Sequence, residues 1–204
     1  MATERKRVSK DQIYDNWAKR NVHFEVELEE SVIRQLADYG SGATRYNAAR
    51  GCILGAGYEV YILAFFIGLY AGVRRPLEGE TKPFGQPVQY WGNLESRGER
   101  SGYPRLREYI FAAAVARTDF DLLAIERGDT PLSKGISAMI LTMDEYANYG
   151  LHLMKDYLEE DRHYFSGNTA MLNLFLPLFE KMNAGYVHDD VADGDDDPDP
   201  EPLD

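Results

Sequence analysis

The spacing of apolar side chains predicts a mainly helical chain. Ile13, Tyr14 and Trp17 share one side of a short helix that begins near Ser9, where Gln12 completes a capping-box pattern. Helical spacing returns over residues 32–37, 46–72, 105–117, 120–127 and 137–160, and over a last stretch from about 168 to before Gly185 that contains Pro177. These stretches predict helices joined by short connections, with one exception near the middle of the chain.

Between the first two helices the pattern changes to that of a strand. Phe24, Val26 and Leu28 alternate with Glu25, Glu27 and Glu29, which is the period of two of a half-buried strand. The three glutamates are expected on the exposed face. A β-ribbon that reads DNA does so with exposed strand side chains, and these carboxylates would repel phosphate. DNA binding in the manner of a ribbon-helix-helix repressor is therefore disfavoured.

The most apolar stretch, residues 60–73, contains no charged side chain. It is too short to cross a membrane comfortably, and the nearby Glu59, Tyr61 and Tyr70 do not suit a lipid-facing helix. We expect a buried central helix.

Residues 77–104 form the exception, because glycine and proline interrupt them too often for regular structure. A loop of this length in a compact domain is usually functional or disordered. Its aromatic side chains argue against simple disorder; they are Phe84, Tyr90, Trp91 and Tyr103.

The fold class expected from these patterns is all-α: a single-domain helical bundle that allows a short N-terminal strand. Residues 1–10 are expected to form a flexible basic N-terminus, residues 11–187 the helical domain with 77–104 as its long loop, and residues 188–204 an acidic disordered tail. A chain of 204 residues is long enough for one domain with a substantial core.

Charge is concentrated at the C-terminus. The net charge is −12, and no basic residue follows Lys181. Nine carboxylates lie in that last stretch, so the rest of the chain carries only about −3. They are Asp189, Asp190, Asp193, Asp195, Asp196, Asp197, Asp199, Glu201 and Asp204. With few apolar residues among them, the tail is expected to stay disordered when alone.

The single Cys52 excludes an intrachain disulfide and favours a cytoplasmic protein. No apolar segment follows Met1, so no secretory signal is predicted. No cofactor is predicted, and no catalytic residue can be assigned.

One candidate for nucleic-acid contact is the region from Arg74 to Arg107, which contains seven basic side chains and four acidic ones. Arginine interleaved with aromatic rings suits contact with phosphates and stacking on bases. The alternative is a loop that docks on its own helices through carboxylate pairs. The candidate residues are Arg74, Arg75, Tyr90, Trp91, Arg97, Arg100, Arg105 and Arg107.

A metal site is a weaker candidate. His152, Asp156, Glu159 and His163 follow one another at intervals of four, three and four residues. One helical face can present such a set to an ion, provided that the helix continues past Glu160. A solvated helix face gives the same spacing. A metal-dependent hydrolase centred on His152 and Asp156 therefore stays open as an alternative.

Two motifs about seventy residues apart carry a resemblance to a known family. The first spans residues 64–77 and the second residues 143–150. Their matching positions are Phe65, Gly68, Arg75, Pro76 and Leu77, and then Glu145, Tyr146, Ala147, Asn148 and Gly150. The chain resembles the small helical proteins encoded beside DNA phosphorothioation (Dnd-type) modification and restriction genes, called DNA phosphorothioation-associated protein 4. The resemblance covers residues 29–158; the loop of residues 79–102 and the acidic tail depart from it.

The resemblance implies an accessory or regulatory role in phosphorothioation-linked antiphage defence, through binding to other proteins of a modification or defence complex. The residues themselves leave two roles open for the second motif. Tyr146 and Asn148 can close hydrogen bonds between packed helices. If Glu145 and Asn148 instead face a groove with Arg74 and Arg75, they form a partner-docking site. Direct binding of DNA remains the second possibility for the protein.

Overall fold

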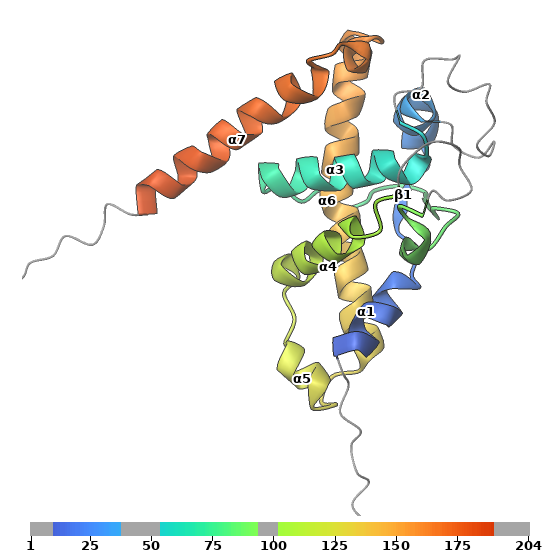
Figure 1. Cartoon of the computed structure of the whole chain (residues 1–204), viewed down its shortest axis with the longest axis vertical. Helices are drawn as coiled ribbons and strands as arrows, with labels where there is room; N and C mark the ends of the chain where they lie inside the picture. Colours follow the sequence, from blue (N-terminus) through green and yellow to red (C-terminus); the bar gives the residue numbers. More distant parts are fainter. Residues whose placement is uncertain (1–9, 38–53, 94–101, 190–204) are drawn as a thin grey trace, which may run out of the picture.

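The computed structural model describes residues 10–37, 54–93 and 102–189, and these are mostly helical (Figure 1). The α-helices are α1 (Lys10–Ala18), α2 (Arg34–Leu36), α3 (Gly57–Ala71), α4 (Leu106–Arg117), α5 (Leu122–Glu126), α6 (Leu132–Glu160) and α7 (Ala170–Asp189). The remaining elements are strands β1 (His23–Glu25) and β2 (Thr81–Pro83), the π-helix η1 (Glu29–Ile33), and the 3₁₀-helices η3 (Val88–Tyr90) and η4 (Tyr164–Ser166). The prediction of a mainly helical chain with a short strand near the N-terminus is confirmed.

The long helix α6 is the axis of the fold. Helix α3 crosses it near its middle, and α1 and α4 lie along its N-terminal half (Figure 1). Helix α7 starts beside the C-terminal end of α6, contacts the end of α3 through Phe175 and Phe179, and then leaves the other helices (Figure 1). Among the described residues, no helix is both long enough and apolar enough to cross a membrane.

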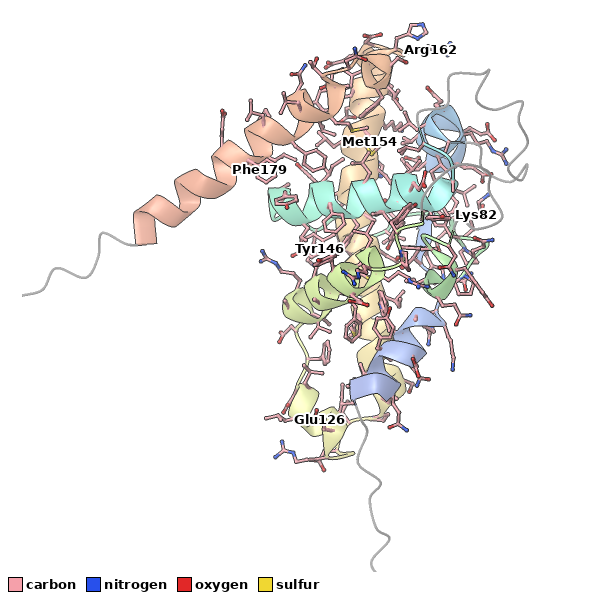
Figure 2. The ribbon with its side chains drawn as sticks, in the orientation of Figure 1. Lys82, Glu126, Tyr146, Met154, Arg162 and Phe179 are labelled. Carbon is pink, nitrogen blue, oxygen red and sulfur yellow. The ribbon has the colours of Figure 1, made fainter. Side chains whose placement is uncertain are left out.

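At the crossing, α3 and α6 touch backbone to backbone. A Cβ atom on Gly68 of α3 would overlap the carbonyl oxygen of Tyr146, and one on Gly150 of α6 would overlap the carbonyl oxygen of Ala64. Tyr146 and Met154 lie on α6 at either side of this level (Figure 2). None of the side chains from Gly57 to Ala71 is exposed. The expectation of a buried central helix is therefore confirmed, and glycine is required where the two helices meet.

The start of α3 differs from the predicted one. Ala37 and Leu54 form a parallel bridge, and the helix begins only at Gly57. The carboxylate of Glu59 accepts the backbone N–H groups of Gly55 and Ala56, at 2.7 and 3.2 Å, and so satisfies donors at the first turn. Residues 46–53 of the predicted helix, with Cys52, lie outside the described residues.

The strand is shorter than the alternating pattern predicted, and the glutamates are not all exposed. β1 pairs antiparallel with β2, with Phe24 opposite Lys82, and the pairing stops at Glu25. The chain then turns into η1, so the alternation does not continue. Glu25 and Glu29 are only 4% and 8% exposed, whereas Glu27 is exposed. The assignment of all three glutamates to a solvent face is wrong, because α6 covers the side of β1 that carries Glu25.

The segment of residues 77–104 is also more ordered than expected. It contains β2 and η3, and the side chains of Phe84, Val88 and Trp91 are buried in the core. Its glycines and prolines turn the chain often enough to exclude long elements, but the apolar side chains between the turns still pack. Residues 94–101 lie outside the described residues.

The last two long helices begin or end away from their predicted limits. Helix α6 begins at Leu132, directly after Pro131, and ends at Glu160, so it starts earlier than the periodic stretch of residues 137–160. Helix α7 continues past Gly185 to Asp189 and contains Pro177. The acidic tail from residue 190 onward lies outside the described residues.

Candidate functional site

Buried polar side chains gather on the face of α6 that meets β1. Asp144, Asn148 and His152 follow one another at intervals of four residues, so they share one side of the helix. Each is at most 9% exposed. We call them, with His23 and Glu25 of β1 and Tyr61 of α3, the polar seam.

One end of the seam is centred on Asp144. Its Oδ1 accepts the backbone N–H of His23 at 3.0 Å and the hydroxyl of Tyr61 at 2.7 Å, and its Oδ2 lies 3.2 Å from His23 Nδ1. Burial raises the pKa of the Asp144 carboxyl, although these hydrogen bonds act in the opposite direction. The hydrogen bond to Asp144 raises the pKa of His23, although burial acts to lower it. Burial, with the adjacent carboxylate, also raises the pKa of Tyr61. The cluster joins β1, α3 and α6.

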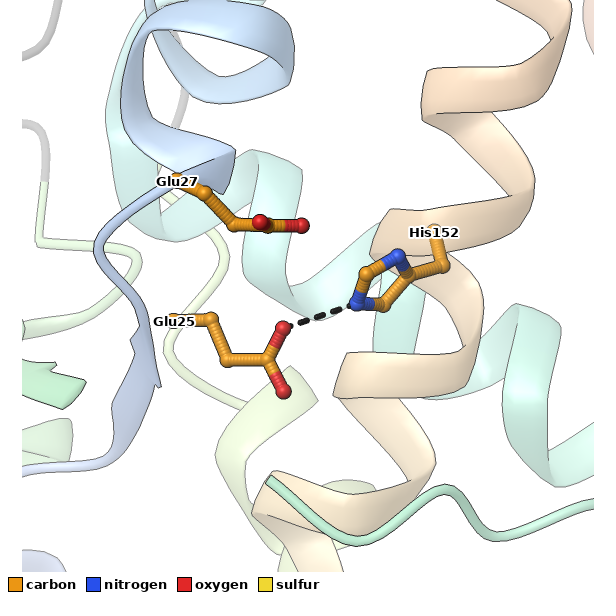
Figure 3. A group of neighbouring side chains, drawn as sticks. All are labelled: Glu25, Glu27 and His152. Carbon is orange, nitrogen blue, oxygen red and sulfur yellow. Dashed lines mark hydrogen bonds and ion pairs between the residues drawn. The ribbon is translucent and has the colours of Figure 1, made fainter. Parts of the chain in front are cut away.

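The other end of the seam is centred on Glu25. Its Oε1 accepts the backbone N–H of Glu78 at 2.6 Å and the Nδ2 of Asn148 at 2.9 Å. Its Oε2 lies 2.8 Å from His152 Nε2 (Figure 3). Burial acts to raise the pKa of Glu25, but the three hydrogen bonds together outweigh it and lower the pKa. Glu25 is therefore a buried carboxylate that is held ionised and fixed in orientation.

The two sequence motifs meet at this end of the seam. Asn148 Nδ2 donates to the carbonyl oxygen of Pro76 at 3.1 Å, and Arg75 N–H donates to the carbonyl oxygen of Glu145 at 3.0 Å. The guanidinium of Arg74 pairs with the carboxylate of Glu145, with Nη2 2.5 Å from Oε2. These contacts hold residues 74–76, which follow α3, against α6. They agree with a structural role for Glu145 and Asn148.

Next to the seam lies a group of side chains suited to a metal ion. One carboxylate oxygen each from Glu25 and Glu27 and one ring nitrogen of His152 lie within 4.8 Å of one another (Figure 3). The set predicted from helical spacing is different. His152 faces Glu25, whereas Asp156 is exposed, and α6 ends before His163. A continuous face from His152 to His163 does not form, because the helix stops at Glu160.

The aromatic pair of the predicted nucleic-acid region is divided between core and surface. Trp91 is 1% exposed and its ring stacks on Tyr58 at 5.7 Å between centroids, with the ring of Tyr61 at 5.6 Å. Tyr90 is 51% exposed. Of the two rings, only that of Tyr90 faces solvent.

The arginines of the same region are also divided. Arg107 donates from Nη1 to the carbonyl oxygen of Gln89 and from Nε to that of Pro104, so its guanidinium ties two turns together. Arg75 and Arg105 are exposed. Arg97 and Arg100 lie outside the described residues.

Sequence reasoning did not single out His23, Glu25, Tyr61 or Asp144 as members of a site. Their partners lie 53 to 127 residues away in the chain, so no local pattern joins them. One signal was present: Asp144, Asn148 and His152 recur every four residues on a helix whose neighbouring positions are largely apolar. Such a polar line on a buried face requires partners on the element that packs against it.

A groove of about 750 Å³ lies on another part of the surface, between α1 and α4. Tyr14, Phe111 and Val115 give it apolar walls, with Asp15 and Glu108 in its lining.

Helix α7 carries the most continuous line of exposed apolar side chains in the described part of the chain. Leu172, Leu176 and Phe179 are 60%, 48% and 38% exposed, and their spacing places them on one side of the helix. The adjoining side packs on α3, where the ring of Tyr70 lies 6.0 Å from that of Phe175 and 4.7 Å from that of Phe179, so Phe179 is at the edge of the line. Figure 2 shows Phe179 near the C-terminal end of α3, where α7 leaves the body.

Comparison with known proteins gives no match, whether by family model, curated sequence or solved structure.

Proposed function

We propose that the protein is a non-catalytic accessory subunit that acts by binding another protein, and that α7 is the binding element. The observation that carries the proposal is the exposed line of Leu172 and Leu176, which Phe179 extends at its edge, where its ring also contacts Tyr70 of α3. Their i, i+4, i+7 spacing is the anchor pattern of a helix that lies in an apolar groove of its partner. Helix α7 leaves the other helices, so a partner can reach this side (Figure 1).

The composition of α7 supports the same assignment. From Ala170 to Phe179 the helix has no charged side chain, and Asn173 is its only strongly polar one. A helix that is apolar on nearly all sides is normally covered. Here Leu172 and Leu176 remain exposed to water. Burying them in a partner's groove would be favourable, because apolar surface would be removed from water.

The charge of the C-terminal segment defines the partner further. Nine carboxylates and no lysine or arginine lie beyond Lys181, at the end of α7 and after it. We therefore expect lysine and arginine beside the partner's groove that binds Leu172 and Leu176. Opposite charges speed association and fix the orientation of the bound helix. A nucleic-acid-handling protein has such a basic surface. We infer that the partner is a protein of this class.

The proposed setting is a phosphorothioation-type DNA modification and defence system, and its support is the resemblance of the two motifs. Those motifs build the α3–α6 crossing in a single-domain helical bundle, so they bear on a shared fold. Helix α7 and the tail lie outside the resemblance and would supply the choice of partner. Direct nucleic-acid binding through the region from Arg74 to Arg107 has less support, since Arg74 and Arg107 already engage protein groups.

The test combines gene context with a pair of matched variants. The genes beside that of this protein are sequenced, and each product is co-expressed with the full chain and purified through a tag on that product. Leu172→Gln with Leu176→Gln removes two anchors that are 60% and 48% exposed. Leu123→Gln with Leu141→Gln is the control, at 63% and 53% exposure on other helices. The expected result is a complex with a DNA-modification or restriction protein that the control retains and the α7 variant loses.

Two results would contradict the proposal. If both double variants lose the complex equally, α7 is not the binding element. If no neighbouring gene encodes a DNA-modification or restriction protein, the proposed setting is wrong. A salt-dependent complex of the wild-type chain with DNA alone, unaffected by the α7 variant, would instead favour the nucleic-acid alternative.

A further inference from the structure

We propose that Glu25, Glu27 and His152 form a binding site for a divalent transition-metal ion such as Zn²⁺. The three side chains come from β1, from the turn after it and from the middle of α6. In Figure 3 both carboxylates point toward the imidazole of His152. The inference is independent of the role of α7.

The candidate ligand atoms lie close enough together to bind one ion after small side-chain movements. Zinc lies about 2.0–2.2 Å from carboxylate oxygen and imidazole nitrogen, which places ligand atoms of one ion roughly 3–3.5 Å apart. Here the candidate ligand atoms all lie within 4.8 Å of one another, and His152 Nε2 is 2.8 Å from Glu25 Oε2. Glu27 is exposed and can adjust its side chain at little cost, whereas the other two ligands are held by packing.

The donor set selects the class of metal. Two carboxylates and one imidazole suit zinc and its first-row neighbours, whereas magnesium and calcium prefer oxygen ligands alone. Three protein ligands leave at least one coordination position for water. Of the three ligands, Glu27 is the one exposed to solvent.

The groups around Glu25 hold it as metal ligands are usually held. Its Oε1 is fixed by Glu78 N–H and by Asn148 Nδ2, at 2.6 and 2.9 Å, which leaves Oε2 directed at His152. Such hydrogen bonds orient carboxylate ligands. Ion binding needs the Nε2 lone pair of His152, so a hydrogen that lies between Nε2 and Oε2 moves to Nδ1 or to solvent.

A second observation is independent of the acidic cluster. Asn148 is 1% exposed, and its Oδ1 is the buried side-chain atom of the described residues that has no hydrogen-bond partner. A buried amide oxygen without a donor is costly. The Nδ2 of the same amide donates to Glu25 Oε1, so the unsatisfied oxygen belongs to a side chain in direct contact with one of the proposed ligands. A water molecule that enters with the ion would supply a donor for it.

Charge supports the same assignment. Glu25 and Glu27 bring two negative charges together, and the cation paired with Glu27 is Lys155, with Nζ 3.4 Å from Oε1. That lysine pairs with the exposed carboxylate only weakly. A divalent ion neutralises both carboxylates and leaves Lys155 to solvent.

The experiment uses the full chain after treatment with a chelator. Zn²⁺ is added, binding is followed by calorimetry, and metal content is measured after desalting. Glu27→Gln removes one ligand with almost no change in shape at an exposed position, so it should fold normally. Glu159→Gln is the control, an exposed carboxylate on α6 outside the site. We expect one tightly bound Zn²⁺ per wild-type chain and per control chain, and an affinity that is weaker by about tenfold or more in Glu27→Gln.

Thermal unfolding provides a second readout. An ion that binds only the folded chain raises Tm, and the increase should be smaller in Glu27→Gln than in Glu159→Gln. Equal binding by both variants would place the ion elsewhere, on the tail carboxylates or another histidine, and would overturn the proposal. Absence of stoichiometric binding to the wild-type chain would show that Glu25 and His152 only join β1 to α6. Neither result affects the proposal for α7.

Discussion

Helices α3 and α7 have similar composition but differ in burial. Residues 60–71 of the first and 170–179 of the second contain no charged side chain. Every residue from Gly57 to Ala71 is at least half-covered by the rest of the protein, yet α7 leaves Leu172 60% exposed and Leu176 48% exposed. Hydrophobicity alone does not decide which of two apolar helices becomes the centre of a core.

The difference lies in the small residues. The backbones of α3 and α6 touch at small residues. These are Ala64 and Gly68 on α3 and Gly150 on α6. Between Leu172 and Phe179 helix α7 has no glycine or alanine, and Pro177 removes one backbone donor. A second helix cannot approach that part as closely. Helix α3 is therefore built to pack inside this chain, whereas α7 is suited to a groove formed by side chains of another protein.

The largest loss of stability is expected when a side chain is added where the backbones of α3 and α6 touch. Gly68→Leu places a side chain against the carbonyl oxygen of Tyr146, which belongs to a helix backbone and cannot rotate away. We expect a loss of more than about 4 kcal/mol in the free energy of unfolding, or no folded protein. Gly85→Leu is the control, because a Cβ at Gly85 meets no atom within 4 Å. Circular dichroism and urea unfolding measure both; equal stability of the two variants would mean that α3 and α6 do not touch.

The comparison is sharpened by the same kind of truncation on each helix. Ile67 of α3 is fully buried, so Ile67→Ala should cost about 2–5 kcal/mol through lost burial and a cavity. Leu176→Ala on α7 should change the free energy of unfolding by less than about 0.5 kcal/mol, since the side chain is 48% exposed. Urea unfolding at several protein concentrations measures both. A large, concentration-dependent cost for Leu176→Ala would show that a second copy of the chain already covers α7.

Much of the helical fold was predictable because its signals are local. Apolar periodicity identified α1, α4 and α6, and the uncharged run identified α3. The strand was harder to predict from the sequence. Alternation placed Glu25 on an exposed face, but β1 has only three residues and α6 covers the side that carries Glu25. A pattern of period two reports which side chains alternate; it does not report whether both faces are covered.

The polar seam was not predictable for a related reason. His23 is 121 residues from Asp144, and Glu25 is 127 residues from His152, so their pairing depends on how β1 docks on α6. Spacing along α6 drew attention to His152 with Asp156, yet Asp156 is exposed. The buried polar positions are 144, 148 and 152. In a helix with an otherwise apolar face, the polar residues on that face are better candidates for a site than those on its solvated side.

The smallest expected effect concerns the ion pair beside the crossing, between Arg74 after α3 and Glu145 on α6. Nη2 of Arg74 lies 2.5 Å from Glu145 Oε2, but the arginine side chain is 42% exposed. Exposed pairs contribute about 0.2–1 kcal/mol, because water and salt screen them. Arg74→Ala should therefore lower the free energy of unfolding by an amount in this range, and less at high salt. A double-mutant cycle with Glu145→Gln isolates the interaction of the pair. A coupling above about 2 kcal/mol that resists salt would mean that the ion pair, rather than the fit at Gly68 and Gly150, holds α3 on α6.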